Sequence, residues 1–158
     1  MKNLPGYKKC IICGKENPIG LNLTFKTDEN KVFVSFALNK NYIGFENRIH
    51  GGVVAAVLDE AMGWACSVKT KNLYYTIELN IRYKKPVKPN ITLNVEAQMF
   101  QTKHSVAYAK GVLKDENGNI LVLSSGNYYP LCEDSEKETM KLLHHKPEDE
   151  IEVTKNDF

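Results

Sequence analysis

The segment from Val53 to Cys66 constrains the fold more than any other part of the chain, because it is apolar on almost every side and contains no proline. A helix without a polar face is normally enclosed by the rest of the protein. Two adjacent carboxylates, Asp59 and Glu60, nevertheless lie at its middle. Since an ionised carboxylate is costly to bury without a partner, we expect at least one of them to reach a cleft or a polar group.

The residues just before this helix, His50, Gly51 and Gly52, suggest a ligand-binding turn. Glycines let the backbone lie close to a ligand, and free N–H groups at a helix start attract negative charge. The rise of a helix separates Gly51 from Asp59 by about 12 Å, which is too far for both to act on one carbonyl group. A second, antiparallel copy of the helix in a dimer would bring the two groups together.

Most of the remaining sequence alternates between polar and apolar residues, which predicts β-strands. The predicted strands lie at residues 21–26, 32–36, 75–83, 91–100, 105–113 and 120–129. Residues 39–48 are predicted to be a loop that leads to the helix. The pattern predicts an α+β fold in which one antiparallel sheet curls around one long central helix.

We divide the chain into a turn-rich N-terminal segment (1–20), the sheet-and-helix domain (21–132) and an acidic tail (133–158). The tail has nine acidic and four basic residues. Ser135 and Glu138 have the spacing of a capping box, which predicts a short helix through Leu143. After Pro147 the acidic residues are expected to be solvated.

Residues 1–132 have seventeen basic and ten acidic residues, a balance that suits an anionic partner such as a phosphate-bearing small molecule. The basic residues are scattered, so we expect no nucleic-acid partner. The first residues have no apolar run typical of a signal peptide, and no apolar stretch is judged long enough to span a bilayer. We therefore expect a cytoplasmic protein with no membrane partner.

Cys10 and Cys13 form a Cys-x-x-Cys pair. Structural zinc needs four ligands, and the sequence has no second pair of this kind. A redox motif would lie near a βαβ pattern, which is absent. The favoured interpretation is a turn that docks two small apolar thiols, with metal binding as the main alternative.

These features resemble the hotdog-fold thioesterases of the phenylacetate-degradation type. The resemblance covers roughly residues 10–131 and rests on His50-Gly51-Gly52, the apolar run to Asp59 and the strand that begins at Thr76. The opening Cys-x-x-Cys-Gly and the following Asn-Pro-x-Gly-Leu are also similar to members of that group. The resemblance implies a homodimer with joined sheets, in some members a homotetramer, with active sites at the subunit interface. The implied substrate is an acyl-CoA thioester.

By position, the resemblance makes Asp59 the catalytic general base or nucleophile. Gly51 or Gly52 of the partner subunit would donate the N–H that polarises the thioester carbonyl. His50 would lie near the thioester, and Thr76 would position the attacking water. Each residue also has a structural alternative: a held carboxylate for Asp59, a helix cap for His50 and a plain strand hydroxyl for Thr76.

Further residues are candidates for substrate binding. Several relatives have an Asn or Gln about six residues before the His-Gly-Gly, where this chain has Gly44, and Asn47 is the nearest substitute. Glu60 points about 100° away from Asp59 around the helix and is expected to face the partner subunit or solvent. Lys84 and Lys103 are candidates for binding the coenzyme A phosphates.

The predicted function is hydrolysis of acyl-CoA thioesters to a free acid and coenzyme A. No metal or redox cofactor is expected, with coenzyme A entering only as part of the substrate. The alternative is a non-catalytic acyl-CoA-binding or lipid-binding module on the same fold. A hotdog hydratase would need a histidine inside the helix about five residues from the aspartate, and this helix has none.

Overall fold

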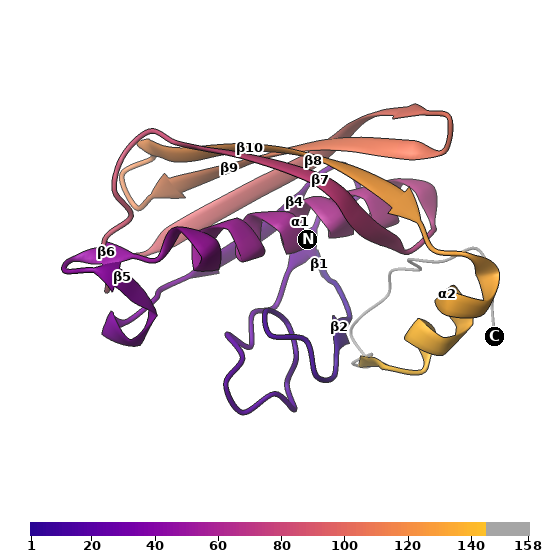
Figure 1. The fold of residues 1–158 in the computed structure, drawn as a ribbon, viewed down its shortest axis with the longest axis horizontal. Coiled ribbons are helices and arrows are strands. Elements are labelled where there is room, and N and C mark those ends of the chain that lie inside the picture. The colour runs from indigo at the N-terminus through magenta and orange to yellow at the C-terminus, as the bar shows by residue number, and fades with distance from the viewer. Residues whose placement is uncertain (145–158) are drawn as a thin grey trace.

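The computed structural model describes residues 1–144. A seven-stranded antiparallel sheet curls over the long helix α1 (Gly51–Thr70), as Figure 1 shows. The strands follow the order β1 (Lys2–Asn3), β3 (Lys26–Thr27), β4 (Val32–Phe36), β8 (Leu93–Lys103), β9 (Val106–Asp115), β10 (Ile120–Pro130) and β7 (Tyr74–Tyr83). The prediction of an α+β fold with a sheet around a central helix is confirmed.

Small residues on the inner face of the sheet allow α1 to lie close to it. Ala97, Ala107 and Ala109 are buried on β8 and β9, and Gly111 follows on β9. A Cβ atom at Gly111 would lie 3.3 Å from the side chains of both Leu58 and Met62 of α1, and 2.6 Å from Ser124 Oγ. The helix is therefore fixed against the middle of the sheet by close packing.

By length and mean hydropathy alone, α1 is long and apolar enough to cross a membrane. The expectation that no apolar stretch of the chain is long enough to span a bilayer is therefore corrected. Over half of its most apolar window, 56%, is buried inside the fold, as in the core helix of a soluble protein. The helix ends at Lys71, whose φ of 60° is left-handed and whose N–H donates to Ser67 O at 2.8 Å.

The predicted strand at residues 21–26 is wrong except at its end. The N–H groups of Leu21 and Leu23 donate to the carbonyl oxygens of Ile11 and Ile12, at 2.8 and 2.9 Å. This segment therefore runs along the N-terminal residues, and only Lys26 and Thr27 join the sheet. Alternation of polar and apolar residues cannot distinguish an extended segment that bonds to a neighbouring loop from one that pairs within the sheet.

Short elements replace the predicted loop at residues 39–48: the 3-10 helix η1 (Lys40–Tyr42), β5 (Ile43–Phe45) and β6 (Arg48–Ile49). Near the C-terminus, α2 (Glu133–Met140) is followed by β11 (Leu143–His144), which pairs with β2 (Gly6–Tyr7).

The predicted capping box is wrong, because α2 begins before Ser135, with Cys132 at its N-cap. Three acidic residues in the first turn, Glu133, Asp134 and Glu136, favour the earlier start. The predicted solvated end of the tail lies outside the described residues.

Candidate active site

Asp59 lies on the side of α1 that faces β7 and β10. Its Oδ1 atom accepts hydrogen bonds from the Thr76 hydroxyl at 2.8 Å and from the Tyr128 hydroxyl at 3.0 Å. Thr76 and Tyr128 are opposite one another in the β7–β10 ladder, so two adjacent strands supply the two donors. Within residues 1–144, no hydrogen bond is made to Oδ2 of Asp59, which leaves that oxygen available for a reactant.

Tyr128 is a site residue that the sequence analysis missed. Its side chain is buried, and burial together with the charge of Asp59 raises the pKa of its phenol, so the hydroxyl stays protonated and donates. Gly126 provides the space, because a Cβ there would lie 2.7 Å from the Tyr128 ring. Alternation on the last strand places Tyr128 inward, but no local pattern indicates that it reaches Asp59.

A cavity of about 80 Å³ adjoins this carboxylate. Its lining includes Asp59, Glu60, Thr76 and Tyr128, together with the rings of Tyr7 and Trp64. A volume of this size is large enough for water next to the aspartate. The site therefore combines a positioned carboxylate with room for a small nucleophile.

The helix start carries the second predicted part of the site. His50 is the N-cap of α1, and its Nδ1 atom accepts a hydrogen bond from the Gly52 N–H at 3.0 Å. The carbonyl of His50 accepts from the N–H groups of Val53 and Val54. In the described residues the Gly51 N–H has no such partner, so Gly51 is a better donor candidate than Gly52.

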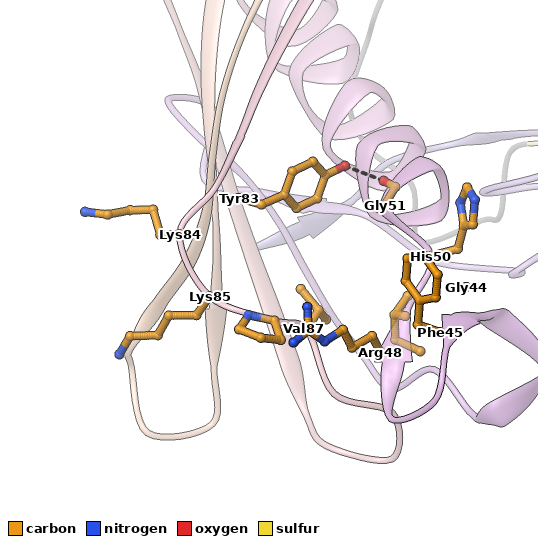
Figure 2. Close-up of a pocket in the computed structure, with 11 residues that line it drawn as sticks. Gly44, Phe45, Arg48, His50, Gly51, Tyr83, Lys84, Lys85 and Val87 are labelled. Carbon is orange, nitrogen blue, oxygen red and sulfur yellow. Dashed lines mark hydrogen bonds between the residues drawn. The ribbon is translucent and has the colours of Figure 1, made fainter.

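A pocket of about 440 Å³ lies beside this helix start and is lined by residues 44–45, 48–51 and 83–87. In Figure 2, the Tyr83 hydroxyl reaches across to the helix and donates to the Gly51 carbonyl, at 2.5 Å. Lys84 and Lys85 lie on the segment that follows β7 and extend away from the helix start, and Arg48 comes from the side of the helix start. The rim of this pocket is therefore basic.

The remaining predicted residues are more widely spread. Asn47 is in the turn between β5 and β6, where its φ of 57° accounts for an asparagine. Lys103 is the last residue of β8 and lies level with the start of β7, because β8, β9, β10 and β7 pair antiparallel in that order. Lys84 follows the end of β7, so the two lysines lie at opposite ends of the strands. Neither Asn47 nor Lys103 lines the pocket of Lys84 in this chain.

Glu60 is half-buried and lines the cavity that also adjoins Asp59, and its carboxylate is bonded within its own chain. Its carboxylate accepts hydrogen bonds from Trp64 Nε1 at 2.9 Å and from the thiol of Cys13 at 3.0 Å. Burial raises the pKa of Glu60 to about 8, and charge on Cys10 adds to this rise. The two adjacent carboxylates of α1 therefore have different surroundings: hydroxyl groups for Asp59, and sulfur and indole for Glu60.

Residues 46–122 match a known protein family. The model of the thioesterase superfamily matches residues 46–122, which include the helix start, Asp59, Thr76 and Lys84. Residues 46–122 are similar to the thioesterase superfamily. The predicted resemblance is confirmed, and the architecture described above is the hotdog fold.

Solved structures agree with this fold. A thioesterase superfamily protein is 22% identical with a TM-score of 0.71, and the match covers 75% of this chain and 62% of that chain, less than two thirds of its length. The PaaI protein from the phenylacetic acid degradation operon of E. coli is 17% identical, with a TM-score of 0.65 and coverage of 71% and 81%. A Streptococcus mutans protein bound to acetyl CoA is 15% identical, with a TM-score of 0.64 and coverage of 70% and 89%. No curated protein matches the chain in a sequence search.

Proposed function

We propose that this thioesterase superfamily protein hydrolyses acyl-CoA thioesters in an active site shared by two subunits. The observation that carries the proposal is the Asp59 carboxylate, which two hydroxyls hold through Oδ1 and which lines a cavity large enough for water. A carboxylate held in one orientation beside water is what general-base catalysis requires.

In the proposed reaction, Asp59 Oδ2 accepts a proton from water as the water oxygen attacks the thioester carbonyl carbon. The tetrahedral intermediate then expels the thiolate of coenzyme A and leaves the free acid, and the proton on Asp59 passes to the thiolate. Direct attack by Asp59 on the carbonyl carbon is the nucleophilic variant of the same scheme. Thr76 and Tyr128 hold the carboxylate in place in either variant.

The negative charge that develops on the carbonyl oxygen needs a donor, and the partner's Gly51 N–H is the proposed one. The Gly51 N–H of the same chain cannot serve, because α1 is continuous from Gly51 to Thr70 and a rise of about 12 Å separates it from Asp59. The proposal therefore requires a dimer in which the two helices lie antiparallel.

Strand β7 favours such a dimer. It is a ten-residue strand at the end of the sheet, and its exposed side chains include Tyr75, Ile77 and Tyr83, each about half exposed. An exposed edge of this length is a template for pairing with another strand.

Fully overlapped antiparallel pairing of two β7 strands would put Thr76 opposite the partner's Ile81, two residues from the partner's Tyr83. Since Tyr83 bonds to Gly51, this register brings Asp59 of one chain toward the partner's Gly51. A homodimer is therefore part of the proposal, and pairing of dimers into a homotetramer is compatible with it.

The test of the proposed function is thiol release from a panel of acyl-CoA thioesters of different chain length and aromatic content. We expect turnover of at least one member, with free acid and coenzyme A formed in equal amounts. Tight binding of acyl-CoA without turnover across the panel would contradict the enzyme and support the non-catalytic binding module.

Replacing Tyr128 by phenylalanine is expected to lower kcat roughly 10- to 150-fold, because a hydrogen bond to a charged group contributes about 1.5–3 kcal/mol. The matched control is Tyr129→Phe, since Tyr129 is the exposed neighbour on the same strand. Steady-state kinetics on the best thioester of the panel would measure both variants. Equal kinetics for the two would rule out a role for the Tyr128 hydroxyl in holding Asp59.

Replacing Lys84 by alanine is expected to raise KM for acyl-CoA roughly two- to fivefold with little change in kcat, which is the scale of an exposed ion pair with phosphate. The difference from wild type should shrink as salt is added, because exposed charges are screened. Lys110→Ala, an exposed lysine in the middle of β9, is the control. Unchanged KM in Lys84→Ala would remove this lysine from the coenzyme A site.

A further inference from the structure

The N-terminal Cys-x-x-Cys turn is folded around its two sulfur atoms. The Ile12 N–H donates to Cys10 Sγ at 3.2 Å, and the Tyr7 N–H donates to Cys13 Sγ at 3.4 Å. Backbone N–H groups aimed at sulfur stabilise a thiolate more than a thiol. Gly14 closes the turn where a Cβ would lie 2.4 Å from Cys10 O, so only glycine fits there.

A third ligand reaches this turn from the central helix. Glu60 Oε1 lies 3.0 Å from Cys13 Sγ, and Glu60 Oε2 lies 3.6 Å from Cys10 Sγ. The ligand atoms of Cys10, Cys13 and Glu60 all lie within 4.8 Å of one another. Sequence reasoning looks for ligands near the cysteines, but this one is separated from Cys13 by 47 residues.

The distances fit tetrahedral coordination. Zinc bonds of about 2.3 Å to sulfur and about 2.0 Å to oxygen, at the tetrahedral angle, put sulfur and oxygen about 3.5 Å apart. The two observed sulfur–oxygen distances, 3.0 and 3.6 Å, lie on either side of that value. Small side-chain adjustments would therefore admit an ion between the three groups.

The chemistry of the three groups selects the ion. Two thiolates favour zinc and similar transition metals over magnesium or calcium, which prefer oxygen ligands. Trp64 Nε1–H donates to Glu60 Oε1 at 2.9 Å and so orients the carboxylate toward the two sulfur atoms.

We propose that Cys10, Cys13 and Glu60 bind a zinc-type divalent ion, with water as the fourth ligand, and that this ion fastens the N-terminal segment to α1. Binding releases the protons of the two thiols and needs no oxidant or reductant. Two docked thiols were the favoured interpretation of the sequence, and metal binding was the main alternative. The proposal takes that alternative, adds Glu60 as the third ligand and does not depend on the proposed reaction.

The ion would also hold one wall of the Asp59 cavity. The Tyr7 ring stacks on Trp64, with ring centroids 5.4 Å apart and an interplanar angle of 21°. Both rings line the cavity that adjoins Asp59, and each is tied to the cluster, Tyr7 through Cys13 and Trp64 through Glu60. The proposed role is structural, at the border of the candidate active site.

The test begins with metal content. Full-length protein purified under reductant, without chelator, is expected to contain roughly one zinc ion per chain. After removal of the metal, cobalt(II) is expected to produce thiolate-to-cobalt charge-transfer absorption. Cys10→Ser and Cys13→Ser should each lower that absorption by about half, because each removes one of two thiolate ligands. Cys132→Ser, which changes an exposed thiol at the start of α2, is the control and should not alter it.

A second measurement needs no variant at the cluster. Trp64 is the only tryptophan of the chain and bonds to Glu60 directly. Titration of chelator-treated wild type with zinc should therefore change its fluorescence to a saturating value at one equivalent. Glu60→Gln and Trp64→Phe should retain the cobalt–thiolate absorption but weaken metal affinity, Trp64→Phe by roughly 10- to 100-fold. Three results would each overturn the proposal: no uptake of zinc or cobalt by the wild type, cobalt absorption unchanged in both cysteine variants, or a Cys10–Cys13 disulfide in protein prepared under reductant.

Discussion

Replacing Asp59 by asparagine is expected to lower kcat/KM for acyl-CoA hydrolysis by roughly 10²- to 10⁴-fold, the usual contribution of a positioned general base. Asparagine has the same shape, and its side-chain oxygen still accepts from Thr76 and Tyr128, so the fold and the binding of coenzyme A should be retained. Thiol release measures the loss of turnover, and thermal unfolding checks the fold.

The matched control for this change is Asp134→Asn, which removes an exposed carboxylate in the first turn of α2. It should leave turnover unchanged. Undiminished hydrolysis by Asp59→Asn would eliminate this carboxylate as base or nucleophile, and with it the proposed mechanism.

Replacing Gly51 by proline is expected to lower kcat by roughly 10²- to 10³-fold, the loss typical of a missing oxyanion donor. Proline removes the N–H at this position and keeps the helix, because the first residue of a helix tolerates proline well. His50 already has φ of −59° and ψ of 131°, the extended conformation that suits a residue before proline.

Gly51→Ala separates the N–H from the added side chain. Both substitutions introduce a Cβ, which would lie 3.0 Å from the Tyr83 hydroxyl, but alanine keeps the N–H. Alanine should therefore retain most of the activity that proline loses. Equal loss in the two variants would assign the effect to crowding of Tyr83 and not to the missing donor.

Mixed dimers test whether the two groups come from different chains. In a dimer of one Asp59→Asn chain with one Gly51→Pro chain, a shared site would leave one of the two active sites intact. Random association of equal amounts should therefore restore about a quarter of the wild-type activity. A site formed within one chain would predict no restoration beyond the two inactive variants.

The periodic parts of the chain were predictable from sequence. The strands expected at residues 75–83, 91–100, 105–113 and 120–129 are found with ends shifted by three residues or fewer. The helix expected from Val53 to Cys66 extends to Gly51–Thr70. The strands alternate because one face packs against the core, and the helix is recognised by its continuous apolar run.

The contacts that complete the site were not predictable, because they join residues far apart in sequence. Tyr128 reaches Asp59 across 69 positions, and a β-bulge between Asn127 and Tyr128 shifts the register of its strand. Cys13 meets Glu60 across 47 positions. Resemblance to a family located Asp59 and the helix start, but only the fold identifies what surrounds each carboxylate.

Asp59 and Glu60 follow one another in α1 and bond to different parts of the protein, the sheet on one side and the N-terminal turn on the other. These two sets of hydrogen bonds together fix the rotation of the helix about its own axis. Inserting or deleting one residue in the first two turns would turn Gly51 by about 100° relative to both carboxylates. Insertions or deletions at residues 44–45 and 84–87, around the basic pocket, lie outside the helix and would leave this angle unchanged.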